Sequence, residues 1–129
     1  MLKWLQTVLH VEPAPRKIME LQAKLVPLAG QKMFGEAEFE VYDNDGWELE
    51  AEVDFRGGQR PSPLIMYLNG KPVLNLAPDH DESEGKLSSR RGDILGVVPA
   101  EGMPIEIKQA GQTVLSGTFE RHPRFQSTG

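Results

Sequence analysis

Acidic residues alternate with apolar residues along two neighbouring stretches of the 129-residue chain. The acidic positions that share this spacing are Glu36, Glu38, Glu40, Glu48, Glu50, Glu52 and Asp54. Carboxylates gathered on one surface attract a cationic partner by charge complementarity, which favours fast encounter and the choice of partner. The sequence therefore predicts a non-catalytic binding or scaffolding module whose acidic surface engages a basic protein segment, a polyamine or a bound metal ion.

A second acidic group surrounds a histidine later in the chain. The candidate metal ligands there are Asp79, His80, Asp81 and Glu84. An imidazole nitrogen among carboxylates suits zinc or another transition metal, whereas carboxylates alone suit calcium or magnesium. This pattern supports an alternative function as a metal-binding protein or metal-dependent hydrolase. A divalent metal is the one cofactor that the sequence suggests.

Other signs of catalysis are missing from the sequence. The histidines His10, His80 and His122 lie far apart in the chain, and no serine stands in a Gly-x-Ser-x-Gly setting. The chain has no cysteine, which excludes thiolate chemistry and disulfides. Apart from the metal alternative, we do not expect an enzyme.

A β-hairpin between Met33 and Phe55 must position the acidic surface. Strict alternation of apolar and acidic residues on both sides of Asp43-Asn44-Asp45-Gly46 predicts two half-buried strands joined by a turn. The apolar sides of both strands coincide only if the loop holds an odd number of residues. A three-residue loop followed by Gly46 as a left-handed bulge meets this condition. Its register pairs Val41 with Trp47, Phe39 with Leu49 and Ala37 with Ala51.

The same register sets glutamate against glutamate on the other side of the hairpin. The predicted pairs are Glu40 with Glu48, Glu38 with Glu50, and Glu36 with Glu52. Like charges directly opposite each other destabilise a sheet by about 0.2–1 kcal/mol per pair. We therefore expect cations nearby, or a function that requires the repulsion.

Residues 1–30 are predicted to form an N-terminal helical segment. Leu2, Leu5 and Leu9 share one helical stripe, and Ile18, Leu21 and Leu25 share a second. Pro15 suits a helix start, while Pro27 and Gly30 suit its end, so the second helix is expected from about 15 to 26. These helices would cap the core of the following domain. Alternatively, they would assemble the protein as a structural subunit, by self-association or by docking on a partner.

Residues 31–122 have the pattern of one antiparallel β domain, followed by a flexible tail over 123–129. Asn69-Gly70 and Ala110-Gly111 each separate two apolar runs, as hairpin turns do. The stretch from Ala77 to Gly85 reads as an acidic loop, and the stretch from Asp93 to Val98 as a buried strand. About seven or eight short strands with turn signals every 8–12 residues favour an immunoglobulin-like antiparallel β-sandwich, although small barrels share these local signals.

Composition narrows the class of partner. The formal net charge is −5 and the isoelectric point is about 5.2, which argues against nucleic acid, because phosphate binding depends on clustered lysine and arginine. No apolar run approaches the roughly 18 residues of a membrane-spanning helix. The expected partner is therefore another protein or a second copy of the chain. The expected location is the cytoplasm, with export left open.

Overall fold

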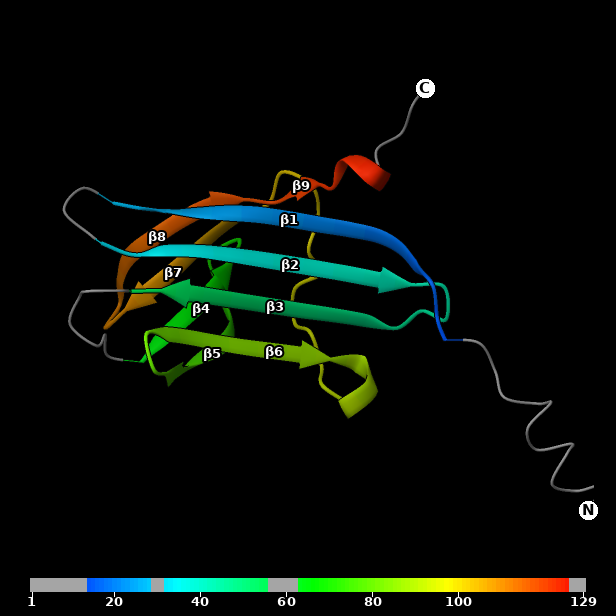
Figure 1. Ribbon diagram of the computed structural model, residues 1–129, viewed down its shortest axis with the longest axis horizontal. Coiled ribbons are helices and arrows are strands. Elements are labelled where there is room, and N and C mark those ends of the chain that lie inside the picture. The colour runs from blue at the N-terminus through cyan, green and yellow to red at the C-terminus, as the bar shows by residue number, and fades with distance from the viewer. Residues whose placement is uncertain (1–13, 29–31, 56–62, 126–129) are drawn as a thin grey trace, which may run out of the picture.

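A computed structural model of the protein describes residues 14–28, 32–55 and 63–125, and these residues form β-strands with short connections (Figure 1). The strands are β1 (Lys17–Pro27), β2 (Phe34–Tyr42), β3 (Trp47–Asp54), β4 (Leu64–Leu68), β5 (Lys71–Asp79), β6 (Glu82–Ser88), β7 (Pro104–Gln109), β8 (Gln112–Thr118) and β9 (Glu120–Arg121). The helices in these ranges are the short 3-10 helices η1 (Ser89–Arg91) and η2 (Pro123–Phe125). None of the described segments is a helix long and apolar enough to cross a membrane.

The strands close into an eight-strand antiparallel barrel. The order around the barrel is β1, β2, β3, β6, β5, β4, β7 and β8, and β8 returns to β1. The short β9 follows β8 along β1 in the same register, since Val26 lies opposite Ser116 and Leu21 lies opposite Arg121. The predicted immunoglobulin-like sandwich is therefore wrong, although the predicted all-antiparallel β architecture is correct.

Two strands that pass from one side of the barrel to the other explain the closure. β1 pairs with β2 as far as Leu25 and with β8 at Val26 and Pro27, and β5 changes its partner from β4 to β6 after Leu76. Glycines permit the close backbone approach at both places. A Cβ atom on Gly117 would lie 2.4 Å from the carbonyl oxygen of Lys24, and one on Gly85 would lie 2.5 Å from that of Asn75. A sandwich would keep its two sheets separate at these corners.

The helix predicted over about 15 to 26 is wrong, because these residues form β1. Leu21, Ala23 and Leu25 are buried and alternate with the exposed Gln22 and Lys24, which is the period of a strand. Ile18, which we assigned to a helical stripe, is 51% exposed. The other predicted helix lies in residues 1–13, outside the described residues. The hypothesis of a structural subunit that assembles through two N-terminal helices therefore lacks the second helix, because β1 occupies these residues.

The predicted register of the β2–β3 hairpin is confirmed at every pair, from Val41 opposite Trp47 to Glu36 opposite Glu52. The turn differs in one detail: the left-handed residue is Asp45, with φ 67°, and not Gly46. Glycine nevertheless suits position 46, because the Asn44 side chain packs closely against it. The side-chain oxygen of Asn44 accepts a hydrogen bond from the Gly46 amide at 2.9 Å, and a Cβ atom on Gly46 would lie 2.8 Å from that oxygen.

The two other predicted hairpins, β4–β5 and β7–β8, are confirmed. Each turn has positive φ at both central residues, Asn69 and Gly70 in one and Ala110 and Gly111 in the other. Two successive left-handed residues are typical of the type I′ turns that match the twist of paired strands.

Two later predictions are wrong. The stretch from Ala77 to Gly85 is not a loop but the end of β5 and the start of β6, joined at His80, which has φ 56°. The stretch from Asp93 to Val98 is not a buried strand but an irregular segment. Leu95 and Val97 pack against the core, while Ile94 and Val98 are largely exposed.

The barrel interior is filled by apolar side chains from every side. The residues at most 2% exposed include Leu21, Leu25, Leu49, Val53, Leu64, Met66, Leu68, Ile105, Ile107, Leu115 and Phe119. Burial of one such side chain stabilises the fold by about 1.5–3 kcal/mol. Because alternate residues of a strand point to opposite sides, this core directs the glutamates of β2 and β3 to the outer surface.

Candidate acidic binding face

The candidate functional site is the outer surface of β1, β2, β3 and β6, which lie side by side in this order (Figure 1). We call it the acidic face. Its residues are Lys17, Glu20, Gln22, Lys24, Glu36, Glu38, Glu40, Glu48, Glu50, Glu52, Asp54, Glu82, Glu84 and Lys86. The predicted hairpin glutamates and Asp54 are all part of it. Glu84 was predicted as a metal ligand in the acidic stretch from Ala77 to Gly85, which also contains Glu82. The residues of β1 and Lys86 of β6 were missed, because their place beside the hairpin depends on strand pairing between distant parts of the chain.

The strand register arranges the acidic face in rows that run across the strands. One row contains Glu20, Glu40 and Glu48. The next contains Gln22, Glu38, Glu50 and Lys86. The third contains Lys24, Glu36, Glu52 and Glu84. Neighbouring strands are about 4.8 Å apart, so carboxylates in one row repel each other at short range.

Lysines neutralise one end of the acidic face. The Lys17 Nζ atom lies 3.0 Å from Glu20 Oε1 and 3.2 Å from Glu40 Oε1, and the Lys86 Nζ atom lies 3.4 Å from Glu48 Oε2. Partial burial acts to lower the pKa of Lys17, but its hydrogen bonds with both glutamates raise it above the ordinary value. The expected cations are therefore present, but the carboxylates of the face outnumber its lysines.

Repulsion persists in the middle of the face, at Glu38. The pKa of Glu38 is raised, first because the side chain is partly buried and then because Glu20, Glu40 and Glu50 surround it with negative charge. Lys17 opposes this shift without cancelling it. A positive charge placed near Glu38 would therefore be favourable.

A second crowded group lies where β3 meets β6. Carboxylate oxygens of Glu52, Glu82 and Glu84 all lie within 4.8 Å of one another. The pKa of Glu52 is raised by partial burial, by a hydrogen bond with Glu82 and by the charges of Glu82, Glu84 and Glu36. A hydrogen bond between two carboxyl groups requires a proton on one of them, so protonation relieves the crowding.

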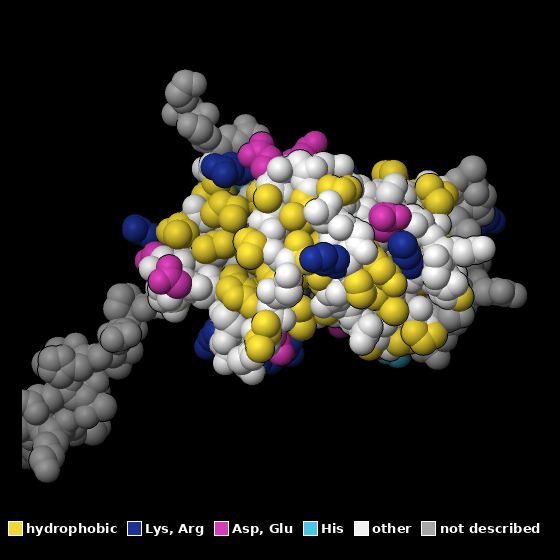
Figure 2. Space-filling view, turned by 180° about the vertical axis from the view of Figure 1, so that it is seen from behind, with side chains coloured by type: hydrophobic (Ala, Val, Ile, Leu, Met, Phe, Trp, Pro, Cys, Tyr) yellow, Lys and Arg dark blue, Asp and Glu magenta, His cyan; other side chains and the backbone are white. Residues whose placement is uncertain are grey.

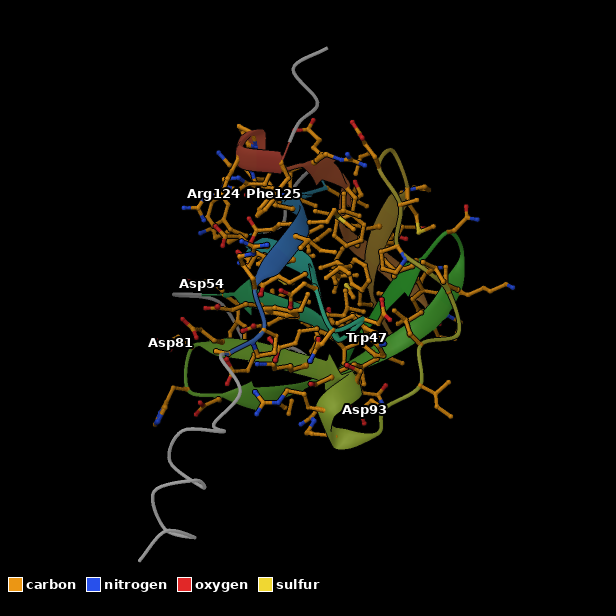
Figure 3. The ribbon with its side chains drawn as sticks, turned by 90° about the vertical axis from the view of Figure 1, so that its right-hand side faces the viewer. Trp47, Asp54, Asp81, Asp93, Arg124 and Phe125 are labelled. Atoms are coloured by element: carbon orange, nitrogen blue, oxygen red, sulfur yellow. The ribbon has the colours of Figure 1, made fainter. Side chains whose placement is uncertain are left out.

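The predicted metal ligands do not converge. The side chain of His80 is 95% exposed, and its Nε2 atom lies 3.7 Å from Asp79 Oδ1. Asp81 belongs to the turn between β5 and β6, where its carbonyl oxygen accepts a hydrogen bond from the Phe55 amide at 3.0 Å. In Figure 3 it appears on the same side of the view as Asp54. Glu84 lies in the crowded group described above. Among the described residues, the acidic groups with such close oxygens include neither Asp79, His80 nor Asp81.

Near Trp47 and Asp93, hydrogen bonds connect η1 and its flanking residues to the ends of β3 and β6 (Figure 3). The Trp47 amide donates a hydrogen bond to Ser89 Oγ at 2.9 Å. The Asp93 carboxylate accepts one from the Ser88 amide at 2.8 Å and is 2.9 Å from Arg91 Nη2. The bond from the Ser88 backbone, followed by Arg91, lowers the pKa of Asp93. These contacts hold β3 and β6 in register beneath the acidic rows.

The far side of the molecule lacks this accumulation of charge. Seen from behind, acidic and basic side chains are scattered among apolar and uncharged ones (Figure 2). Within the described ranges, the dense grouping of carboxylates therefore belongs to the side formed by β1, β2, β3 and β6.

No protein-family model matches the sequence, and no curated protein matches it at significant similarity. The function is therefore argued from the acidic face.

Proposed function

We propose that the protein is a non-catalytic binding module whose acidic face engages a cationic partner. The observation that carries this proposal is the set of glutamate pairs across β2 and β3, extended by acidic residues of β1 and β6. A rigid sheet with fixed negative charges raises the encounter rate of a positively charged molecule and disfavours acidic ones.

Protection of a sheet edge does not explain the charge. Acidic and basic residues often prevent exposed edge strands from pairing with other chains. In this barrel β2 lies between β1 and β3, and β3 lies between β2 and β6, so neither hairpin strand is an edge. The repulsion among Glu38, Glu40 and Glu50 therefore favours a role in binding.

The spacing of the charges favours a partner with several cations. Outward residues two apart on one strand are separated by about 6.6–6.8 Å, and neighbouring strands by about 4.8 Å. A flexible polyamine or a basic protein segment can contact several rows at once, whereas a single monovalent cation contacts one. Binding should accordingly weaken with salt, which screens exposed charges.

Calorimetric titration of the full chain with spermine and with an octalysine peptide tests the proposal. We expect binding at low salt that weakens steeply as salt is added. The double variant Glu38→Gln/Glu50→Gln should lose about tenfold in affinity, equivalent to about 1.4 kcal/mol. The control Asp45→Asn/Glu101→Gln removes the same charge outside the acidic face and should bind as the wild type does. Affinity that is indifferent to salt and to the face variant would contradict the proposal.

A divalent cation is the second candidate ligand, favoured by the convergent oxygens of Glu52, Glu82 and Glu84. Hard cations such as calcium and magnesium prefer carboxylate oxygens. The metal-binding or hydrolase alternative at His80 predicts instead a transition metal held by His80 together with Asp79, Asp81 and Glu84. Thermal melts of chelator-treated protein with calcium, magnesium or zinc distinguish these sites. A rise with calcium or magnesium that Glu84→Gln abolishes indicates the glutamate group, and a rise with zinc that His80→Ala abolishes indicates the histidine.

A further inference from the structure

The outer surface changes from charged to apolar at one end of the acidic face. On β1 and β2 the residues just beyond the Leu25–Gly35 pair are Val26 and Phe34, which are 57% and 68% exposed. Leu28, two residues after Val26, is 46% exposed. We call these three residues the apolar rim. Exposed large apolar groups next to a charged surface are typical of interaction sites.

The apolar rim borders a groove of about 340 Å³. Val26 and Phe34 line its apolar part, and the acidic face contributes three carboxylates and one lysine, namely Glu36, Glu52, Asp54 and Lys24. The groove therefore keeps an excess of negative charge. Phe34 is also paired with Asp54 across β2 and β3. An aromatic ring and carboxylates therefore meet in one concave surface.

We infer that the partner of the acidic face is a basic protein segment that carries an apolar or aromatic anchor, and that this anchor packs against Val26 and Phe34 while neighbouring lysines or arginines contact Glu36 and Glu52. This inference rests on the proposed function and specifies the chemistry of the partner. Binding energy commonly concentrates in aromatic anchors surrounded by weaker polar contacts.

Charge complementarity distinguishes this occupant from two others. The anionic surface of a lipid bilayer would be repelled by Glu36, Glu52 and Asp54 beside the rim. A second copy of the chain that used the same patch in a twofold contact would bring these carboxylates against their equivalents. A polyamine satisfies the charges but offers no anchor for Phe34. A basic segment with an anchor satisfies both parts of the groove.

Two synthetic peptides of equal charge test the inference on the full chain. Each carries several lysines, and one has a central tryptophan where the other has serine. We expect the tryptophan peptide to bind about tenfold more tightly, and we expect Phe34→Ser to remove that advantage without changing the affinity for the serine peptide. Because Phe34 is mostly exposed, the variant should remain folded, which circular dichroism checks. The matched control Ile94→Ser changes a residue that is 89% exposed outside the acidic face, and it should keep the advantage.

The outcomes separate the inference from the proposed function. Equal affinity for both peptides, or an advantage that survives Phe34→Ser, overturns the inference and leaves the acidic face as a binding site. Failure of both peptides to bind in a salt-dependent way overturns the proposed function, and the inference with it. A dimer that Phe34→Ser dissociates, or binding to phosphatidylcholine vesicles that the same change abolishes, overturns the inference in favour of self-association or a membrane.

Discussion

The strands on both sides of the barrel alternate between inward and outward residues, but their outward charged residues have different neighbours. On the side formed by β4, β5, β7 and β8, two charged groups have complementary partners: Glu106 accepts a hydrogen bond from Thr113 Oγ1 at 2.6 Å, and Lys108 Nζ lies 4.5 Å from the centre of the Tyr67 ring. We call this the neutral side. On the acidic face, glutamates lie opposite glutamates at successive positions of β2 and β3.

This difference indicates that a strand of this barrel does not need like-charged residues on its outward side. Both sides direct apolar residues inward, and on the neutral side Glu106 lies opposite Tyr67 and Ser116 rather than another carboxylate. The like-charge pairs contribute nothing to packing and oppose pairing of the strands. Under the proposed function, these pairs serve to attract a cationic partner.

The largest change in stability should come from a larger side chain at Gly117, where β8 approaches β1 closely. In Gly117→Ala the added Cβ would meet the Lys24 carbonyl oxygen, and this clash should lower the free energy of unfolding by about 1–3 kcal/mol. Urea denaturation measures the loss. The matched control is Gly96→Ala, where a Cβ atom meets nothing within 4 Å. Equal stability of both variants would mean that the corner is not a tight junction.

Removal of one glutamate pair should stabilise the acidic face. Glu38→Gln/Glu50→Gln eliminates the repulsion of that pair, so the free energy of unfolding should rise by about 0.2–1 kcal/mol. Glu106→Gln on the neutral side should give no such gain, since Glu106 already accepts a hydrogen bond. Comparison of the two by urea denaturation at low salt tests the contrast directly. A stability loss in the face variant would show that its charges are satisfied within the fold.

The smallest effect concerns pH. Because the pKa values of Glu38 and Glu52 are raised above 4.5 in the folded protein, these groups favour folding when protonated. Their contribution is present below about pH 4.5 and is lost as the pH rises through the raised folded values. In Glu52→Gln the free energy of unfolding should decrease less than in the wild type as the pH rises above about 4.5. Urea denaturation at several pH values between 4 and 7 measures it, and identical profiles would contradict the shift at Glu52.

Asp93 should behave in the opposite way. Its pKa is lowered by the Ser88 amide and Arg91, so its contribution to folding is present above the unfolded pKa and is lost as the pH falls through the lowered folded value. Asp93→Asn should remove this acid-side loss. Urea denaturation extended below about pH 4 provides the measurement. If the loss of stability toward acid pH is the same in Asp93→Asn and the wild type, the contacts with Ser88 and Arg91 do not stabilise the carboxylate in solution.

The sequence predicted the β2–β3 hairpin and its glutamate pairs because alternation and turn chemistry determine register locally. It did not predict β1, since Leu21 and Leu25, four residues apart, fit both a helical stripe and one side of a strand. Barrel closure was also missed, because it depends on what Gly85 and Gly117 approach in space. The convergence of Glu52 with Glu82 and Glu84 likewise arises from the pairing of β3 with β6.

The most direct test of the acidic face is amide chemical-shift mapping of the isotope-labelled chain during titration with the octalysine peptide. We expect the shifts to concentrate in β1, β2, β3 and β6, to be weak in β4, β7 and β8, and to disappear at high salt. Shifts spread evenly over both sides, or concentrated on the neutral side, would contradict the proposed function.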